Sequence, residues 1–114
     1  MNVPEFRAGV QAWLADHDLT PGPDHSLDGQ VRQLARVRRA LHDAGWMRYG
    51  WPARVGGLGG APVLRAVLGE EVARRDLAEP GIYSMVEVLA PTMISYAPAA
   101  LAAEMVPRLL SGRE

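Results

Sequence analysis

Apolar residues recur every three or four positions in separate stretches of the chain, which is the spacing of one face of an α-helix. A first helix is predicted over residues 4–17, with its apolar face formed by Phe6, Val10, Trp13 and Leu14. A second is predicted over residues 30–43, with a buried side formed by Val31, Leu34, Val37 and Leu41. A third begins at Pro62 and carries a broad stripe formed by Val63, Leu64, Val67, Leu68 and Val72. These patterns predict amphipathic helices that share one core.

The stretch from Ile82 to Tyr96 differs because it is apolar on all sides, with Glu87 as its one charge. An all-round apolar helix is typical of a central, buried position. Pro91 should kink or divide this helix, since an interior proline lacks the amide hydrogen of the helical bond. A last helix is predicted from about Ala99, with Pro107 making an irregular turn and with apolar positions at Leu101, Val106, Leu109 and Leu110.

No apolar–polar alternation of period two extends over four residues, so β-structure is not expected. The pattern predicts an all-α fold, an up-and-down helical bundle of about five or six helices. At 114 residues, the chain has the length of a single domain, and residues 1–114 are taken as one.

Between the second and third predicted helices, the stretch from Gly45 to Gly60 holds six of the twelve glycines and two of the three tryptophans. Gly45 occupies the position of a C-terminal helix cap, and large indole rings favour a tightly folded loop over a flexible tether. The connection from Leu19 to Gly29 contains two prolines and two glycines, which predicts a surface loop.

Composition excludes several classes of protein. The net charge of -1 gives no general attraction to nucleic acid or to an anionic membrane. The lack of cysteine excludes disulfides, a thiolate nucleophile and Cys-ligated metal. The sequence shows neither a signal-peptide pattern nor an apolar run of roughly 20 residues that could span a bilayer, so a cytoplasmic location is the default expectation.

The polar groups offer little distinctive chemistry. The glycine-rich stretch resembles a phosphate-binding loop, but it lacks lysine and the required spacing, so a structural turn is favoured. The three histidines are well separated and are expected to be surface or capping residues, with no metal site: His17, His25 and His42.

The acidic residues are better explained by ion pairs than by catalysis. Glu70 and Glu71 each have an arginine four residues on, which predicts salt bridges to Arg74 and Arg75. Glu87 lies among apolar residues, where an ionised carboxylate is costly unless paired. A buried pair with an arginine is therefore favoured over a catalytic role.

Two further groups have alternative interpretations. The arginine cluster is expected to be a solvated face or a domain contact rather than an anion site, and it consists of Arg32, Arg36, Arg38 and Arg39. A second set at helical spacing either packs in the core, which is the commoner outcome, or lines an apolar ligand slot: Tyr83, Ser84, Met85 and Val88.

Three blocks of sequence, in this order, resemble the N-terminal α-helical domain of the acyl-CoA dehydrogenase family. They are Gly-Trp … Tyr-Gly-Trp-Pro … Gly-Gly-Leu-Gly-Gly over residues 45–60, Leu-Gly-Glu-Glu-Val-Ala-Arg over 68–74, and Ala-Pro … Met-Val-Pro-Arg-Leu-Leu-Ser-Gly over 97–112. The resemblance covers essentially the whole chain. Proteins of that family also have a middle β-domain and a C-terminal four-helix domain, and they use FAD to introduce an α,β double bond into acyl-CoA thioesters.

The resemblance implies that the middle β-domain and the C-terminal helical domain are absent from these 114 residues. Most flavin contacts and the usual catalytic glutamate lie in those domains, so no catalytic, cofactor-binding or metal residue is expected in this chain. The family's fourth helix and the break before it face the acyl chain. The implied substrate-binding residues, forming one wall of the acyl pocket, are Gly81, Tyr83, Ser84, Glu87 and Val88. Glu87 departs from an apolar lining and indicates either a polar acyl group, such as a ring or side-chain oxygen, or an ion pair.

The resemblance therefore implies an N-terminal domain of an FAD-dependent enzyme of fatty acid metabolism, inert alone and binding no FAD alone. Its implied partners are the missing domains in cis or trans, the acyl-CoA substrate, an electron-transfer partner and, in a homo-oligomer, further copies. The main rival is a non-catalytic helical protein-interaction module with the same fold, followed by a free-standing binder of a hydrophobic acyl group. Because the family covers one side of the apolar fourth helix, the chain alone is expected to expose apolar surface or to self-associate.

Overall fold

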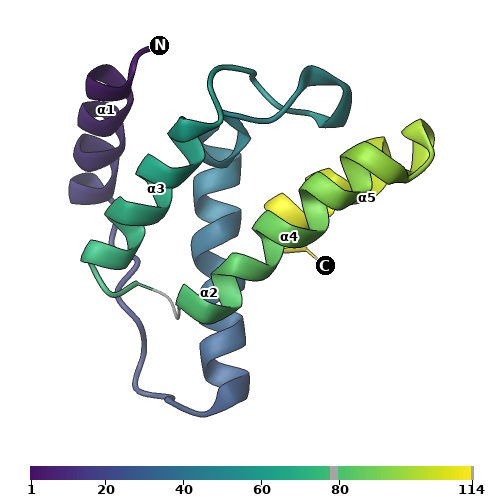
Figure 1. Cartoon of the computed structure of the whole chain (residues 1–114). Coiled ribbons are helices and arrows are strands. Elements are labelled where there is room, and N and C mark those ends of the chain that lie inside the picture. Colours follow the sequence, from purple (N-terminus) through teal and green to yellow (C-terminus); the bar gives the residue numbers. More distant parts are fainter. Residues whose placement is uncertain (78–79, 114) are drawn as a thin grey trace.

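The computed structural model describes residues 1–77 and 80–113, with the backbone alone for residues 80–85. Its helices are α1 (Val3–Asp16), α2 (Leu27–Asp43), α3 (Val63–Arg74), α4 (Pro80–Tyr96) and α5 (Ala99–Leu110), with the short 3-10 helices η1 (Trp46–Arg48) and η2 (Ala53–Val55) between α2 and α3. Consecutive helices run in alternating directions (Figure 1). The described residues form no strand beyond an isolated bridge between Tyr49 and Gly59, so the predicted all-α, up-and-down fold is confirmed.

Polar caps set where the first two helices begin. The Asn2 side chain accepts the amide hydrogen of Glu5 at 2.9 Å, and α1 starts at Val3, close to the prediction. The Ser26 hydroxyl accepts the amide hydrogen of Gly29 at 3.1 Å. Because this bond satisfies one of the free amides of the first turn, α2 starts at residue 27, three residues before its predicted start.

The core lies where α1, α2, α3 and the loop between α2 and α3 meet, and α4 and α5 close it from the side. Most predicted apolar faces are buried. Val31 is an exception at 47% exposed, because the first turns of α2 extend beyond the other helices at the lower end of Figure 1. Val63 and Leu101 are also exposed, and both lie in the first turn of their helices. The burial predicted for these three residues was wrong.

The loop from Gly45 to Gly60 joins the helices to one another. Gly45 follows α2 with a φ of 95°, the left-handed conformation predicted for it. The Trp46 ring meets the ring of Phe6, on α1, edge to face at 5.6 Å. Trp51 is buried, and it lies against α3 through the Arg65 guanidinium, which stacks over its ring at 3.9 Å. The prediction of a tightly folded, ring-pinned loop is confirmed.

Pro91 and Pro107 lie inside α4 and α5, which continue through them. Of the two outcomes predicted for Pro91, a kink or a division of the helix, the division is therefore wrong, and so is the irregular turn predicted at Pro107. The loss of single helical hydrogen bonds is offset by packing of α4 on α5.

The end of α4 gains a bond from the loop. The carbonyl of Ile94 would ordinarily bond to the amide four residues on, but that residue is Pro98, which has none. The Arg54 guanidinium supplies the missing donor at 3.0 Å.

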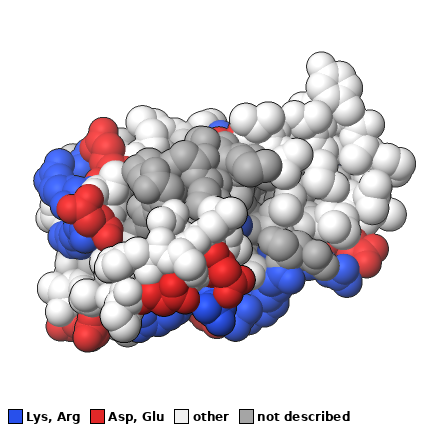
Figure 2. Space-filling view, turned by 90° about the horizontal axis from the view of Figure 1, so that it is seen from below, with Lys and Arg blue, Asp and Glu red and all other residues white. Residues whose placement is uncertain are grey.

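Helix α4 lies at the side of the bundle rather than at its centre, so the prediction of a central position was wrong. Val86 and Ala90 are buried on one side. The other side exposes apolar residues, and with one residue of α5 they form what we call the α4–α5 surface: Val88, Leu89, Tyr96 and Leu101. Figure 2 shows mostly uncharged atoms on the right-hand side, where α4 and α5 reach outward. The predicted exposure of apolar side chains is confirmed.

Candidate functional site

All five candidate site residues lie in the first half of α4. The structure describes the side chains of Glu87 and Val88. Those of Gly81, Tyr83 and Ser84 lie outside the described residues, and their role remains a prediction.

Glu87 pairs with an arginine from the preceding helix. Its Oε2 lies 3.7 Å from Nε of Arg65, on α3, and its side chain is 41% exposed. The predicted arginine partner is confirmed, but the predicted burial of the pair was wrong, because α4 leaves one side open to solvent.

Arg65 is held between two elements. Its guanidinium stacks on Trp51, from the loop, and its side chain is largely buried. Its Nε is buried without a hydrogen bond among the described residues. A hollow of about 10 Å³ adjoins the pair, and its lining is Met47, Tyr49, Trp51, Arg65, Leu68, Val86, Glu87 and Leu110. Sequence spacing could not have revealed this contact between α3, α4 and the loop.

Val88 follows Glu87 and is 65% exposed, and Leu89 after it is also exposed. Along α4, the paired carboxylate of Glu87 therefore adjoins exposed apolar residues. The arrangement suits contact with a ligand that is mostly apolar and carries a polar group.

The two adjacent glutamates form structural ion pairs. Glu71 is fully buried and accepts hydrogen bonds from Arg75 and Arg7, each at 2.7 Å, and from Gln11 at 3.2 Å. The bond from Arg75, followed by that from Arg7, lowers the pKa of Glu71 to about 2. The predicted pair with Arg75 is confirmed.

Glu70 pairs with Arg7 at 2.9 Å, so its predicted partner Arg74 was wrong. Arg74 instead lies 3.9 Å from Glu71, one turn earlier on the same helix. The carboxylates thus join α3 to α1, and they do not form a catalytic pair.

The arginine cluster of α2 is divided by its surroundings. Arg38 is buried at 8% exposed and donates to the carbonyl of Leu109 at 3.5 Å, so for this residue the predicted solvated face was wrong. Arg32 is exposed and pairs with Asp24 and Asp28. Arg36 donates to the backbone carbonyls of Thr20 and Asp18, and Arg39 is exposed.

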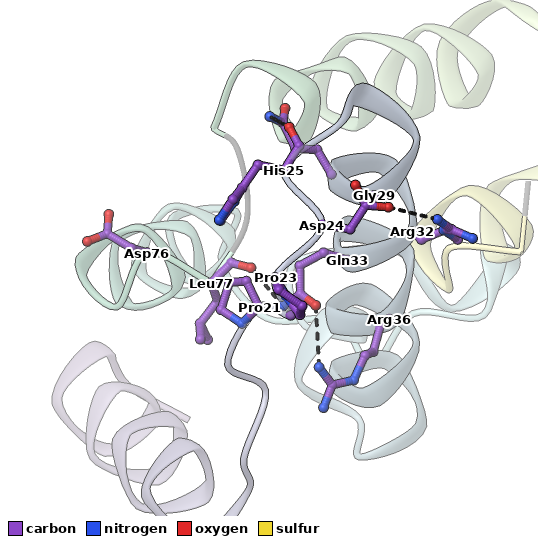
Figure 3. Close-up of a pocket in the computed structure, with 12 residues that line it drawn as sticks. Pro21, Pro23, Asp24, His25, Gly29, Arg32, Gln33, Arg36, Asp76 and Leu77 are labelled. Carbon is purple, nitrogen blue, oxygen red and sulfur yellow. Dashed lines mark hydrogen bonds and ion pairs between the residues drawn. The ribbon is translucent and has the colours of Figure 1, made fainter.

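A hollow of about 480 Å³ between the 21–25 loop, the start of α2 and Leu77 was not predicted from the sequence. Figure 3 shows the rings of Pro21, Pro23 and His25 beside Gln33 and Leu77. The Gln33 amide nitrogen donates to the carbonyls of Leu19 and Leu77, at 2.6 and 2.9 Å. A hydrogen bond from Ser26 lowers the pKa of Asp24, which also pairs with Arg32. The polar groups of this hollow thus bond mainly to one another, and it carries no distinct chemistry.

His17 and His25 take the predicted surface places, whereas His42 is mostly buried. His17 is exposed and stacks on Trp13 at 4.0 Å, and His25 is exposed. Burial of His42, in the last turn of α2, lowers its pKa. In the described part of the chain, no three His, Asp or Glu side chains gather as a metal site would require. None of the helices described combines the length and apolarity needed to cross a membrane.

The glycine-rich loop does not fit a cofactor phosphate. The amides of Gly50 and Gly59 donate to the carbonyls of Gly59 and Trp51, at 2.8 and 2.9 Å. The amide of Gly57 donates to Pro52 at 3.0 Å. Because these donors are used inside the loop, they are not free to bind an anion such as a flavin pyrophosphate.

Comparison with known proteins supports the resemblance found in the sequence. The family model of the acyl-CoA dehydrogenase N-terminal domain matches residues 4–113. The chain is 31% identical to acyl-CoA dehydrogenase IpdE1 of Mycolicibacterium smegmatis, over 100% of this chain and 31% of that protein. It is 32% identical to acyl-CoA dehydrogenase IpdE1 of Mycobacterium tuberculosis, over 95% of this chain and 30% of that protein. The chain thus spans about a third of the length of these relatives. No solved structure matches significantly.

Proposed function

Since this chain belongs to the acyl-CoA dehydrogenase family, whose N-terminal domain it matches, we propose that it is the N-terminal helical domain of an FAD-dependent acyl-CoA dehydrogenase. The complete protein would introduce an α,β double bond into an acyl-CoA thioester. The match across residues 4–113 carries this proposal, and both relatives named above are acyl-CoA dehydrogenases. Because those relatives are about three times as long, a middle β-domain and a C-terminal helical domain would complete the enzyme in cis or in trans.

Within that enzyme, the first half of α4 forms one wall of the acyl pocket, through Gly81, Tyr83, Ser84, Glu87 and Val88. Helical spacing supports a shared role, since positions 81, 84 and 88 recur on one face and positions 83 and 87 are one turn apart. The exposed Val88 offers apolar contact to an acyl chain, and contact there excludes water from the chain.

The chain contributes positioning rather than chemistry. A bound FAD supplies the hydride acceptor in this family, and the glycine-rich loop described above does not hold it. We assign no catalytic base to this chain and expect it to be inert alone. The complete protein would be cytoplasmic and homo-oligomeric, would belong to fatty acid metabolism and would pass electrons to a redox partner.

Visible spectroscopy of the purified 114-residue chain with added FAD and acyl-CoA tests this assignment. We expect no retained flavin band after gel filtration and no dye-linked turnover. A chain that retained FAD and oxidised acyl-CoA by itself would contradict it. Sequencing of the coding region after residue 114 adds a second readout, since a continuing frame that encodes a flavin domain supports an intact enzyme.

A non-catalytic interaction module is the second candidate. The uncharged α4–α5 surface favours it, because such a surface suits a partner protein as well as it suits a neighbouring domain. A reading frame that stops after residue 114, together with a stable partner that carries no flavin, would favour the module over the enzyme domain.

A further inference from the structure

Gln33, in the first half of α2, bonds to two segments that lie far apart in the sequence. Its Nε2 donates to the carbonyl oxygen of Leu19 at 2.6 Å and to that of Leu77 at 2.9 Å. Leu19 lies in the loop after α1, and Leu77 lies between α3 and α4. Both leucines are buried in the core. One side-chain amide therefore ties the chain after α1 and the chain after α3 to α2.

The hydrogen-bond partners of Gln33 fix the orientation of its amide. A primary amide donates through its nitrogen, which carries two hydrogens, and accepts through its oxygen. The oxygen, Oε1, accepts from Nη1 of Arg36 at 3.3 Å, and Figure 3 shows this bond beside Leu77. An amide turned by 180° would place its oxygen against two carbonyl oxygens and its nitrogen against a guanidinium. Both hydrogens are therefore committed to the two carbonyls.

The carbonyl of Leu77 lies at a sharp change of chain direction. Asp76, just before it, has a φ of 52°, a left-handed conformation that is uncommon for a residue with a side chain. Leu77 precedes Pro80, the first residue of α4, by three positions. Helix α4 packs mainly on α5, so the connection from α3 helps to set where its first turns lie. The bond from Gln33 holds that connection against α2.

We propose that Gln33 is a positioning residue for the acyl wall: by holding the Leu77 carbonyl against α2, it fixes where the first half of α4 lies. The inference rests on the proposed function, because it takes Gly81, Tyr83 and Ser84 as members of that wall. Gln33 acts through the backbone and takes no part in the chemistry.

Hydrogen exchange of the 114-residue chain, followed by NMR, tests whether Gln33 holds α4. Gln33→Met keeps the length of the side chain and removes both donors, and Gln33→Glu keeps its shape but places a carboxylate there, which cannot donate. We expect the amides of residues 84–90 to exchange about three- to tenfold faster in both variants, because lost hydrogen bonds make local opening easier. Preserved amide spectra show that a variant folds.

Gln30→Met is the matched control. Gln30 lies one turn earlier on α2, and its Nε2 donates to the carbonyl of His25, in the adjoining loop, at 3.1 Å. Its loss removes a bond of the same kind from the same helix without touching the connection to α4. We expect this variant to leave exchange in residues 84–90 unchanged.

Steady-state kinetics of the complete, flavin-loaded protein separates positioning from general stability. Gln33→Met should raise the KM for an acyl-CoA about three- to tenfold and leave kcat within about twofold of the wild type. This split is expected because the wall binds the acyl group equally in the ground state and in the transition state. Gln30→Met should change neither constant.

The outcomes separate the two proposals. Unchanged exchange in residues 84–90 would overturn the role of Gln33 and leave the acyl wall standing. Faster exchange there with an unchanged KM would overturn the positioning role and also count against an acyl wall formed by α4. Equal acceleration along the whole chain, or loss of the folded spectrum in both Gln33 variants, would assign Gln33 to general stability and overturn the proposal.

Discussion

Replacement of the buried Glu71 by glutamine should destabilise the fold by removing the charge that ties α1 to α3. The Glu71 carboxylate accepts from Arg7 of α1 and from Arg75 of its own helix, and its side chain is fully buried. Breaking a buried charge pair costs roughly 3–5 kcal/mol when the remaining charge stays buried. Here the two arginines keep 30% and 32% exposure and can be hydrated, which favours the lower end of that range.

The proton affinity gives a second measure of the same interaction. The pKa of Glu71 falls from an ordinary value of 4.5 to about 2, chiefly through the hydrogen bond from Arg75. At about 1.4 kcal/mol for each tenfold change in proton affinity, that difference corresponds to about 3 kcal/mol. We therefore expect Glu71→Gln to lower the free energy of unfolding by about 3 kcal/mol at pH 7, out of a total of roughly 5–15 kcal/mol.

Urea unfolding followed by circular dichroism at pH 7 measures this loss. The neighbouring Glu70→Gln is the matched control, because Glu70 is 59% exposed and pairs only at the surface with Arg7. We expect the control to lose no more than about 1 kcal/mol. A Glu71→Gln variant within about 0.5 kcal/mol of the wild type, the ordinary range for surface substitutions, would refute the reasoning.

The difference between wild type and Glu71→Gln should also depend on pH. Because the folded state lowers the pKa of Glu71, its stabilisation is complete above the unfolded value of 4.5 and is lost as pH falls towards about 2. The unfolding free energies of the wild type and of Glu71→Gln should therefore converge as the pH falls from 4.5 to about 2. A gap that stays constant down to pH 2 would show that the carboxylate charge is not its source.

Three further predictions concern the loop, His42 and the exposed surface. Gly57→Ala should lower the free energy of unfolding by at least about 2 kcal/mol, because an added Cβ would lie 2.0 Å from the carbonyl oxygen of Trp51. Gly22→Ala is the control, because a Cβ added there would have no atom within 4 Å. Equal urea midpoints for the two variants would contradict the prediction. The NMR titration midpoint of His42 should lie below 6.5, since burial disfavours the charged imidazole. The free energy of unfolding should therefore fall slightly as the pH drops from 6.5 through that midpoint. A midpoint above 6.5 would contradict this prediction. Leu101→Ser should weaken any self-association seen in analytical ultracentrifugation, whereas Leu27→Ser, exposed at the start of α2, should not; equal effects would rule out the α4–α5 surface as the contact.

Helix positions were predictable because the apolar period of each segment matches the side that the bundle buries, as with Phe6, Val10 and Leu14. The start of α2 was missed because a single hydroxyl, that of Ser26, adds three residues to the helix. Pro91 does not divide α4, because packing on α5 offsets one lost hydrogen bond. The bond from the amide of Gly29 to Ser26 is a local contact, whereas the packing of α4 on α5 joins two elements and cannot be read from the local sequence.

The candidate site was predictable only in part. The sequence indicated that Glu87 needs a cation, but it could not identify Arg65, which comes from another helix. It paired Glu70 with the arginine one turn on, whereas the actual partner, Arg7, lies 63 residues away. Glu87 is exposed because α4 lies at the side of the bundle. That position depends on how the five helices pack, and the composition of α4 alone does not reveal it.

Photolabelling tests the acyl-wall role most directly. The flavin-loaded assembly that contains this chain would be irradiated with an acyl-CoA that carries a diazirine at its acyl end, and the labelled peptides identified by mass spectrometry. We predict label within residues 81–88, reduced by excess unmodified acyl-CoA. Label that acyl-CoA displaces but that lies wholly outside this segment of α4 would contradict the account.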